Sequence, residues 1–213
     1  SWVMLKALGK RERNKLTTGS RDVVIVGGGI VACLSGYLLG RRGYKVTILE
    51  ADSLGSHASG FAFGGLDPLT GIGLPEPLLD FSLWCFVRHR SLARELHETT
   101  GIDVGFELRD RLNLAFNNEE TKVLKDQIEW MKDVGGFTVE WVNNAEARRL
   151  EPQVSGEITG ALYQRSPGAL EPYRFILAAM RAAERYGVEM LQRRAIGLIS
   201  DGDRVTGVTL ESG

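Results

Sequence analysis

The chain has 213 residues, of which 43% are hydrophobic and 25% charged, and its formal net charge is −1. This composition is typical of a globular protein with one large or two small domains, and it gives no reason to expect a nucleic-acid partner. The two cysteines imply no disulfide framework and favour a reducing compartment, the cytoplasm, and no apolar stretch reaches the length of a membrane span.

Residues 1–21 form a separate region by composition, because six of their side chains are basic and only Glu12 is acidic. We interpret this region as a solvated basic N-terminal extension. An organelle transit segment is the alternative, since such segments are also basic and contain serine and threonine.

Residues 22–50 have the pattern of the first half of a dinucleotide-binding domain. The apolar run 23–26 predicts a strand buried on both faces, and glycines 27–29 predict a sharp turn into a helix. A second apolar run, 46–49, predicts the next strand, which the carboxylate of Glu50 closes. Strand, glycine turn, helix, strand and acid follow one another in the order and spacing of that motif.

The physical chemistry of nucleotide binding explains why each of these residue types suits its position in the motif. Gly27 allows a sharp turn, and Gly29 lets the backbone approach a pyrophosphate that the helix N-terminus attracts. Glu50 can accept both hydroxyls of an adenosine ribose and would repel a 2′-phosphate, which favours FAD or NAD over NADP. Ala32 replaces the third glycine and still allows close helix–strand packing. The alternative is an α/β unit with a tight turn and no ligand.

The loop over residues 51–65 is rich in glycine, serine and alanine. Such small residues suggest backbone that lies against a ligand, and the alternative is a mobile connector. Residues 66–77 contain three prolines and are expected to be irregular.

The rest of the chain predicts alternating helices and short strands. Phe81 and Trp84 recur near helical spacing, and we expect Val123 to face inward. We expect Trp84, Trp130 and Trp141 to pack in the core, and a stacking role is the alternative. We expect Asn118 to cap the second of these helices. The predicted elements are a helix over 80–100, strands over 106–108 and 112–116 joined by 109–111, a helix from 118 to about 134, a strand over 139–142, a helix over 144–150, a strand over 158–164, a helix over 171–186, strands over 188–191 and 196–199, and, after a turn at 201–202, a strand over 205–210.

Three stretches in this order resemble one family. They are the glycine motif, the loop Gly-Ser-His-Ala-Ser-Gly-Phe-Ala-Phe-Gly-Gly at 55–65, and the helix start Gly-Ala-Leu-Glu-Pro-Tyr-Arg-Phe at 168–175. Together they resemble the FAD-dependent amino-acid oxidase family of glycine oxidase, sarcosine oxidase and D-amino acid dehydrogenase, over residues 22–213. The resemblance implies an α/β fold, with a Rossmann-like FAD-binding domain from 22–66 and 167–213. It also implies an inserted α+β substrate domain over 67–166, whose sheet covers one face of the flavin.

The resemblance also implies the cofactor contacts. In the family pattern, Gly27, Gly29, Ile30 and Val31 meet the pyrophosphate, Glu50 and Ala51 lie at the adenosine ribose, Ala58, Ser59, Gly64, Gly65 and Leu66 pass the flavin, and the backbone of Ile196 meets the adenine. The implied reaction is hydride transfer from the α-carbon of a small amine or amino acid to flavin, with oxygen or a quinone as electron acceptor. We assign no catalytic residue, and we expect no metal site at His57, His89 or His97.

Family members usually continue well beyond this length, and the substrate arginine and the aromatic residue over the flavin usually lie in that later part. We therefore expect an N-terminal portion, a truncated product or a subunit that a partner chain completes. Three hypotheses follow: an FAD-dependent oxidoreductase, a flavin-binding subunit or fragment without independent catalysis, and an NAD-dependent dehydrogenase. The long loop over 51–65 argues against the third, because a nicotinamide fold usually continues directly into further βα units.

Overall fold

The computed structural model describes residues 2–5, 21–71 and 73–211. The chain divides into two compact units. Unit 1 contains residues 1–63, 93–104 and 171–213, and unit 2 contains residues 64–92 and 105–170. These boundaries differ from the predicted ones mainly because residues 93–104 belong to unit 1. The functions predicted for the two domains stay predictions.

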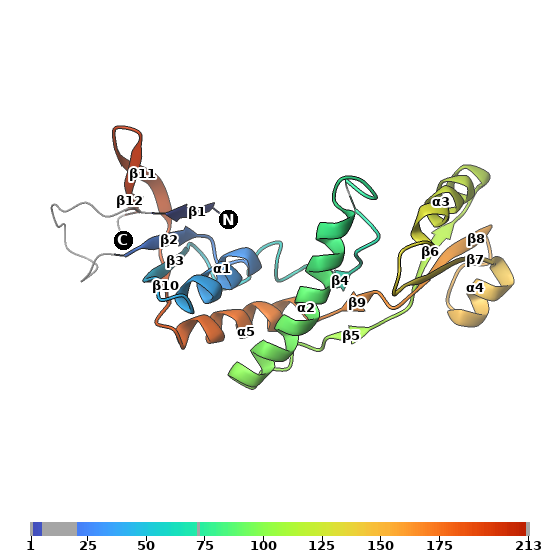
Figure 1. Ribbon diagram of the computed structural model, residues 1–213, viewed down its shortest axis with the longest axis horizontal. Coiled ribbons are helices and arrows are strands. Elements are labelled where there is room, and N and C mark those ends of the chain that lie inside the picture. The colour runs from blue at the N-terminus through green and yellow to red at the C-terminus, as the bar shows by residue number, and fades with distance from the viewer. Residues whose placement is uncertain (1, 6–20, 72, 212–213) are drawn as a thin grey trace. The chain divides into compact units, whose positions relative to one another are not determined.

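A four-stranded sheet with the order β1-β2-β3-β10 is the centre of unit 1 (Figure 1). β2 and β3 are parallel, as are β3 and β10, in which Glu189 pairs with Thr47. β1 lies in the predicted N-terminal extension and pairs antiparallel with β2, while residues 6–20 lie outside the described residues. The predicted α/β architecture is confirmed. The strands are β1 (Trp2–Leu5), β2 (Val23–Val26), β3 (Val46–Glu50) and β10 (Glu189–Gln192).

Helices α1 (Ile30–Gly40) and α5 (Pro172–Glu184) pack against each other beside this sheet (Figure 1). Small residues allow α1 to lie close to its neighbours. A Cβ atom on Gly36 would lie 3.0 Å from the Cδ1 atom of Ile48, and one on Gly40 would lie 2.7 Å from the Cγ2 atom of Val188. Close packing therefore continues along α1 despite the alanine at the third glycine position.

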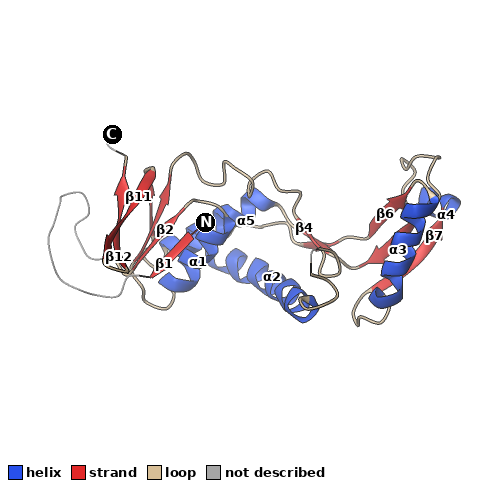
Figure 2. Cartoon of the chain, turned by 90° about the horizontal axis from the view of Figure 1, so that it is seen from above, coloured by secondary structure: helices blue, strands red, loops and turns tan. Residues whose placement is uncertain are grey.

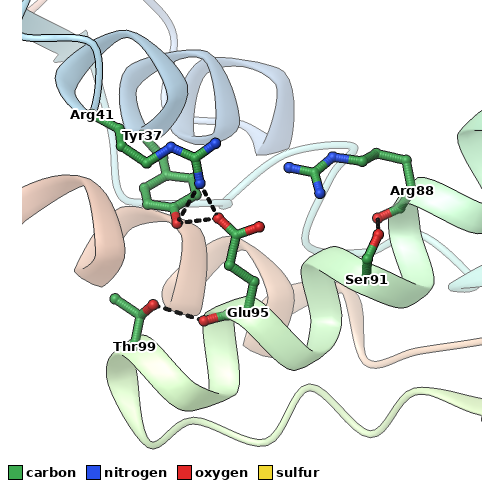
Figure 3. A network of polar contacts seen from close by, with 6 residues as sticks. All are labelled: Tyr37, Arg41, Arg88, Ser91, Glu95 and Thr99. Atoms are coloured by element: carbon green, nitrogen blue, oxygen red, sulfur yellow. Dashed lines mark hydrogen bonds and ion pairs between the residues drawn. The ribbon is translucent and has the colours of Figure 1, made fainter.

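Polar contacts join α1 to the C-terminal part of α2 (Leu79–Thr100), of which residues 93–100 belong to unit 1 (Figure 3). The Glu95 carboxylate accepts hydrogen bonds from the Tyr37 hydroxyl and the Arg41 guanidinium. One turn later, the Thr99 hydroxyl donates to the Glu95 carbonyl oxygen at 2.7 Å. The Tyr37 ring also lies 5.9 Å from the Tyr186 ring, so this buried tyrosine connects α1, α2 and the residues that follow α5.

The last strands of unit 1 form a separate two-stranded sheet. They are β11 (Ala195–Asp201) and β12 (Arg204–Leu210), which pair antiparallel. The predicted turn joins them, and Gly202 has the positive φ of 57° that such a turn favours.

Unit 2 contains a three-stranded antiparallel sheet with the order β6-β8-β7 (Figure 2). Alternate residues of β8 enter different clusters: Ala161 and Tyr163 pack with Ala147 of α4, whereas Leu162 packs with Met131 of α3. Because the side chains of a strand alternate between faces, α3 and α4 cover opposite faces. The elements are β6 (Arg111–Ala115), β7 (Thr138–Asn143), β8 (Gly160–Arg165), α3 (Asn118–Met131) and α4 (Asn144–Leu150).

A second small sheet of unit 2 was not predicted. It has the order β4-β9-β5 and consists of β4 (Gly65–Leu66), β9 (Gly168–Ala169) and β5 (Glu107–Leu108). The predicted strands over 106–108 and 112–116 therefore belong to different sheets, since β5 pairs with β9 and β6 pairs with β8.

Two groups of predictions were wrong in unit 2. The cap of α3 is Asn117 and not Asn118, because the Asn117 side chain accepts the hydrogen bond from the Glu120 N–H. Two residues expected to face the core are exposed: Val123 and Trp84, the second with 61% of its surface accessible. Phe81 and Trp84 instead stack on each other on the outside of α2, with ring centroids 6.2 Å apart.

Among the helices in the described part of the chain, none combines the length and the apolar character that crossing a membrane requires.

Candidate cofactor site

The turn between β2 and α1 has the geometry of a phosphate-binding turn. Gly27 has a φ of 102°, which favours glycine, and its N–H donates to the Leu49 carbonyl oxygen at 2.8 Å. Gly29 is the N-cap of α1, and the first turn of the helix contains no acidic residue. The N–H groups of this first turn have no partner within the helix, so its positive end can accept an anion.

Glu50 is held beside this turn and is only 7% exposed. Its Oε2 atom accepts the Gly28 N–H, and its Oε1 atom accepts the Asp52 N–H at 2.8 Å. A carboxylate has about four lone-pair sites, so these two bonds orient Glu50 and leave capacity for ribose hydroxyls. Sequence reasoning missed Gly28: a Cβ atom there would lie 2.9 Å from the Glu50 Oε2 atom.

The loop after β3 folds back onto the N-terminus of α1. The Ser59 hydroxyl accepts the Ile30 N–H at 3.3 Å, and a Cβ atom on Gly29 would lie 2.9 Å from the Ser59 Oγ atom. A Cβ atom on Gly60 would lie 2.0 Å from the Gly55 carbonyl oxygen. Part of the small-residue pattern therefore reflects contact of the loop with its own backbone, in addition to any contact with a ligand.

Most of the predicted cofactor residues lie in unit 1. The contacts of Ser59 with Ile30 and Gly29, and of Glu50 with the glycine turn, bring the main predicted groups together. Ile196 lies in the separate β11–β12 sheet with 60% of its surface exposed. The placements are: Gly27, Gly29, Ile30 and Val31 at the turn and the start of α1, Glu50 and Ala51 at the end of β3, Ala58 and Ser59 in the loop, and Gly64, Gly65 and Leu66 in unit 2.

His57 lies near Glu50 but is already engaged. Its Nε2 atom lies 2.7 Å from the Asp52 Oδ2 atom, and the Arg194 guanidinium lies 3.7 Å from Asp52. One ligand atom from each of Glu50, Asp52 and His57 lies within 4.8 Å of the others. Because Glu50 accepts two backbone N–H groups and Asp52 faces an arginine, this geometry favours an ion-pair cluster over a metal site.

Cys33 lies in α1, behind the glycine turn. Burial raises the pKa of its thiol from 9.0 to about 12, and the nearby Glu50 charge acts in the same direction. The thiol therefore stays protonated near neutral pH and is a packing residue rather than a nucleophile.

These groups are compatible with a dinucleotide: Gly29 has no side chain at the N-terminus of α1, and the Glu50 carboxylate, held by two backbone N–H groups, keeps acceptor capacity. The family model DAO, described as FAD dependent oxidoreductase, matches residues 22–213 of this chain. The chain belongs to this family. Family membership confirms FAD as the cofactor and decides against the NAD alternative.

The relatives of this DAO-family chain include glycine oxidases and a synthase subunit. Glycine oxidase of Geobacillus kaustophilus is 32% identical over 167 residues, which cover 78% of this chain and 44% of that protein. The hydrogen cyanide synthase subunit HcnC of Pseudomonas aeruginosa is 27% identical, with coverages of 90% and 54%. The crystal structure of glycine oxidase from Bacillus cereus superposes with a TM-score of 0.80 at 28% identity, with coverages of 91% and 54%. The chain thus spans about half the length of these relatives.

Proposed function

We propose that this chain provides the FAD-binding part, and part of the substrate domain, of an oxidoreductase that acts on a small amine or amino acid. The observation that carries the proposal is the Glu50 carboxylate, oriented by the Gly28 N–H beside the N-terminus of α1. The glycine oxidases among its relatives support the choice of substrate class.

The residue assignments follow the family pattern, and the contacts of Glu50 with Gly28 and of Ser59 with Ile30 support those at the glycine turn. Residues 22–66 and 167–213 form the FAD-binding domain in this proposal, and residues 67–166 form the inserted domain. The proposed contacts are Gly27, Gly29, Ile30 and Val31 with the pyrophosphate, Glu50 and Ala51 with the ribose, Ala58, Ser59, Gly64, Gly65 and Leu66 with the flavin side, and the Ile196 backbone with the adenine.

When bound, FAD would supply an acceptor for the hydride on the carbon next to the amine. The residues of this chain hold and orient the cofactor: the α1 N-terminus neutralises phosphate charge, and Glu50 fixes the ribose. Oxygen or a quinone would take the electrons in a second step. We also propose a cytoplasmic location, which agrees with the two free thiols of Cys33 and Cys85.

A visible absorbance spectrum of the purified chain, with the released cofactor identified by mass, tests this proposal. We expect stoichiometric FAD in the wild-type chain and none in Gly29→Glu, because that side chain enters the space beside Ser59. Gly135→Glu is the matched control, since a Cβ atom on Gly135 meets nothing within 4 Å. A Gly29→Glu chain that keeps its full FAD content contradicts the assignment.

A second candidate function is a flavin-binding subunit without independent catalysis. It is favoured because a relative that is 27% identical to this chain is itself named as a synthase subunit. The wild-type chain loaded with FAD should then fail to transfer electrons from glycine or other small amino acids to an artificial acceptor. Turnover by this chain alone would exclude the second candidate and support the first.

A further inference from the structure

A cavity of about 400 Å³ lies in unit 2, beside the sheet β6-β8-β7. It arises because α4 is short and packs mainly against β7 and β8. The neighbouring strand β6 therefore contributes Leu112 and Leu114 to a hollow next to the end of α4. The volume falls within the range of about 300–1,000 Å³ that is usual for small-molecule pockets.

The lining of this cavity has an apolar part and an acidic part. Leu112, Leu114, Leu150 and Val154 provide the apolar part. Asp110, Glu151 and the hydroxyl of Tyr163 provide the acidic and polar part, and Arg111 completes the lining.

The single arginine does not neutralise the acidic part, because its guanidinium is engaged elsewhere. In Arg111, Nη1 donates to the Asp67 Oδ2 atom at 3.0 Å, and Nε donates to the Asn113 Oδ1 atom at 3.0 Å. Arg165 also lies beside Tyr163: its guanidinium lies over the ring, 5.3 Å from the centroid, and forms an ion pair with Glu140 at 3.6 Å.

The two carboxylates keep unused acceptor capacity. Asp110 accepts the Tyr163 hydroxyl and a long, 3.4 Å bond from the Ser166 N–H, and Glu151 accepts the Gln153 N–H at 3.1 Å. The hydrogen bond to Asp110 raises the pKa of Tyr163, so this hydroxyl remains a donor. Ionised carboxylates only accept hydrogen bonds, at about four lone-pair sites each. A ligand that fills the remaining sites must therefore donate hydrogen bonds.

We propose that this cavity binds an alkylammonium ion. Its ammonium group donates to Asp110 and Glu151, and its alkyl chain contacts the leucines of β6 and the side chains of Leu150 and Val154. The cation makes charge-assisted hydrogen bonds, and the chain removes apolar surface from water. All these residues belong to unit 2, so the proposal does not depend on the flavin site of unit 1.

Isothermal titration calorimetry of the full chain with n-butylammonium and with 1-butanol tests the charge requirement. The two probes have similar size, and only the first is a cation. We expect n-butylammonium to bind at least about tenfold more tightly, and Asp110→Asn to weaken its binding by about tenfold, because a charged hydrogen bond is lost. Equal binding of the two probes, or unchanged binding to Asp110→Asn, would overturn the proposal.

Leu150→Trp tests the location of the site. Leu150 is 47% exposed, so an indole can project from it and obstruct the cavity without entering the core. Leu108→Trp is the matched control, since Leu108 is 49% exposed in the same unit and does not line the cavity. We expect Leu150→Trp to abolish butylammonium binding and Leu108→Trp to leave it unchanged. The reverse pattern, or an equal effect of both, would place the ligand elsewhere; if Leu150→Trp does not fold, the Asp110→Asn result decides.

Discussion

The replacement Gly28→Ala places a methyl group against the carboxylate that orients the cofactor site. The added Cβ atom would lie 2.9 Å from the Oε2 atom, 3.0 Å from the Cγ atom and 3.1 Å from the Cβ atom of Glu50. A rotation of the carboxyl group alone does not relieve the contacts with Cγ and Cβ, and Glu50 is buried. The side chain or the turn must therefore shift.

We expect Gly28→Ala to lower the free energy of unfolding by about 1–3 kcal/mol, the usual cost of overpacking. The loss is larger where the charged hydrogen bond from the Gly28 N–H also breaks, because such bonds contribute about 1.5–3 kcal/mol. Urea unfolding followed by far-ultraviolet circular dichroism measures the change. Gly135→Ala is the control, with an expected stabilisation of about 0.4–1 kcal/mol, because its Cβ meets nothing.

The contact with Glu50 is tested by a double-mutant cycle. In a Glu50→Ala background the Oε2 and Cγ atoms are gone, so Gly28→Ala should cost less there than in the wild type. Flavin binding gives a second measure: Gly28→Ala should raise the dissociation constant of FAD by about tenfold or more, which corresponds to about 1.4 kcal/mol. An equal cost in both backgrounds, with unchanged FAD binding, would refute the reasoning.

Three further predictions concern single contacts. Gly40→Ala should lower the free energy of unfolding by about 1–3 kcal/mol, because the added Cβ atom would lie 2.7 Å from the Val188 Cγ2 atom. The loss should be smaller in a Val188→Ala background. Equal losses in both backgrounds would argue against this contact. Asn117→Ala should lower the free energy of unfolding in urea by about 0.5–2 kcal/mol, and Asn118→Ala by far less, because only Asn117 caps α3. A larger loss for Asn118→Ala would instead support Asn118 as the cap, as the sequence predicts. Burial raises the pKa of Cys33 from 9.0 to about 12, so the unfolded chain loses this proton first as pH rises. The free energy of unfolding should therefore fall by up to about 1.4 kcal/mol per pH unit between pH 9 and 12, and the same pH series on Cys33→Ala should lack this component.

The sequence pattern was sufficient to predict an element and its bounds where local signals and burial agree. β2, α1 and β3 follow from two apolar runs, a glycine turn and a terminal acid, and their boundaries lie close to the predicted ones. The helix α4 has the predicted bounds: the capping box of Asn143 and Glu146 fixes its start, and its end lies just before Pro152. In such segments the local preference and the tertiary environment favour the same structure.

The features that the sequence did not predict depend on contacts between distant parts of the chain. β4 and β9 have two residues each, too few for any period, and they exist because Gly65 pairs with Ala169. Trp84 was expected in the core because helical spacing gives the relative positions of apolar residues but not the side that is covered. At the site, the pattern identified Glu50 but not the dependence of its orientation on Gly28, which requires coordinates.

The pairing of β3 with β10 has a consequence for synthesis on the ribosome. The two strands pair Thr47 with Glu189, so the glycine turn and β3 emerge long before the strand that completes their sheet. Residues 64–92 and 105–170, which make up unit 2, are complete before β10 is translated. Because the entropy of closing a long loop must be overcome before this pairing forms, unit 2 can fold first. The edge of β3 that later pairs with β10 therefore stays unpaired while residues 51–188 are translated, and chaperones can bind the nascent segment during that time.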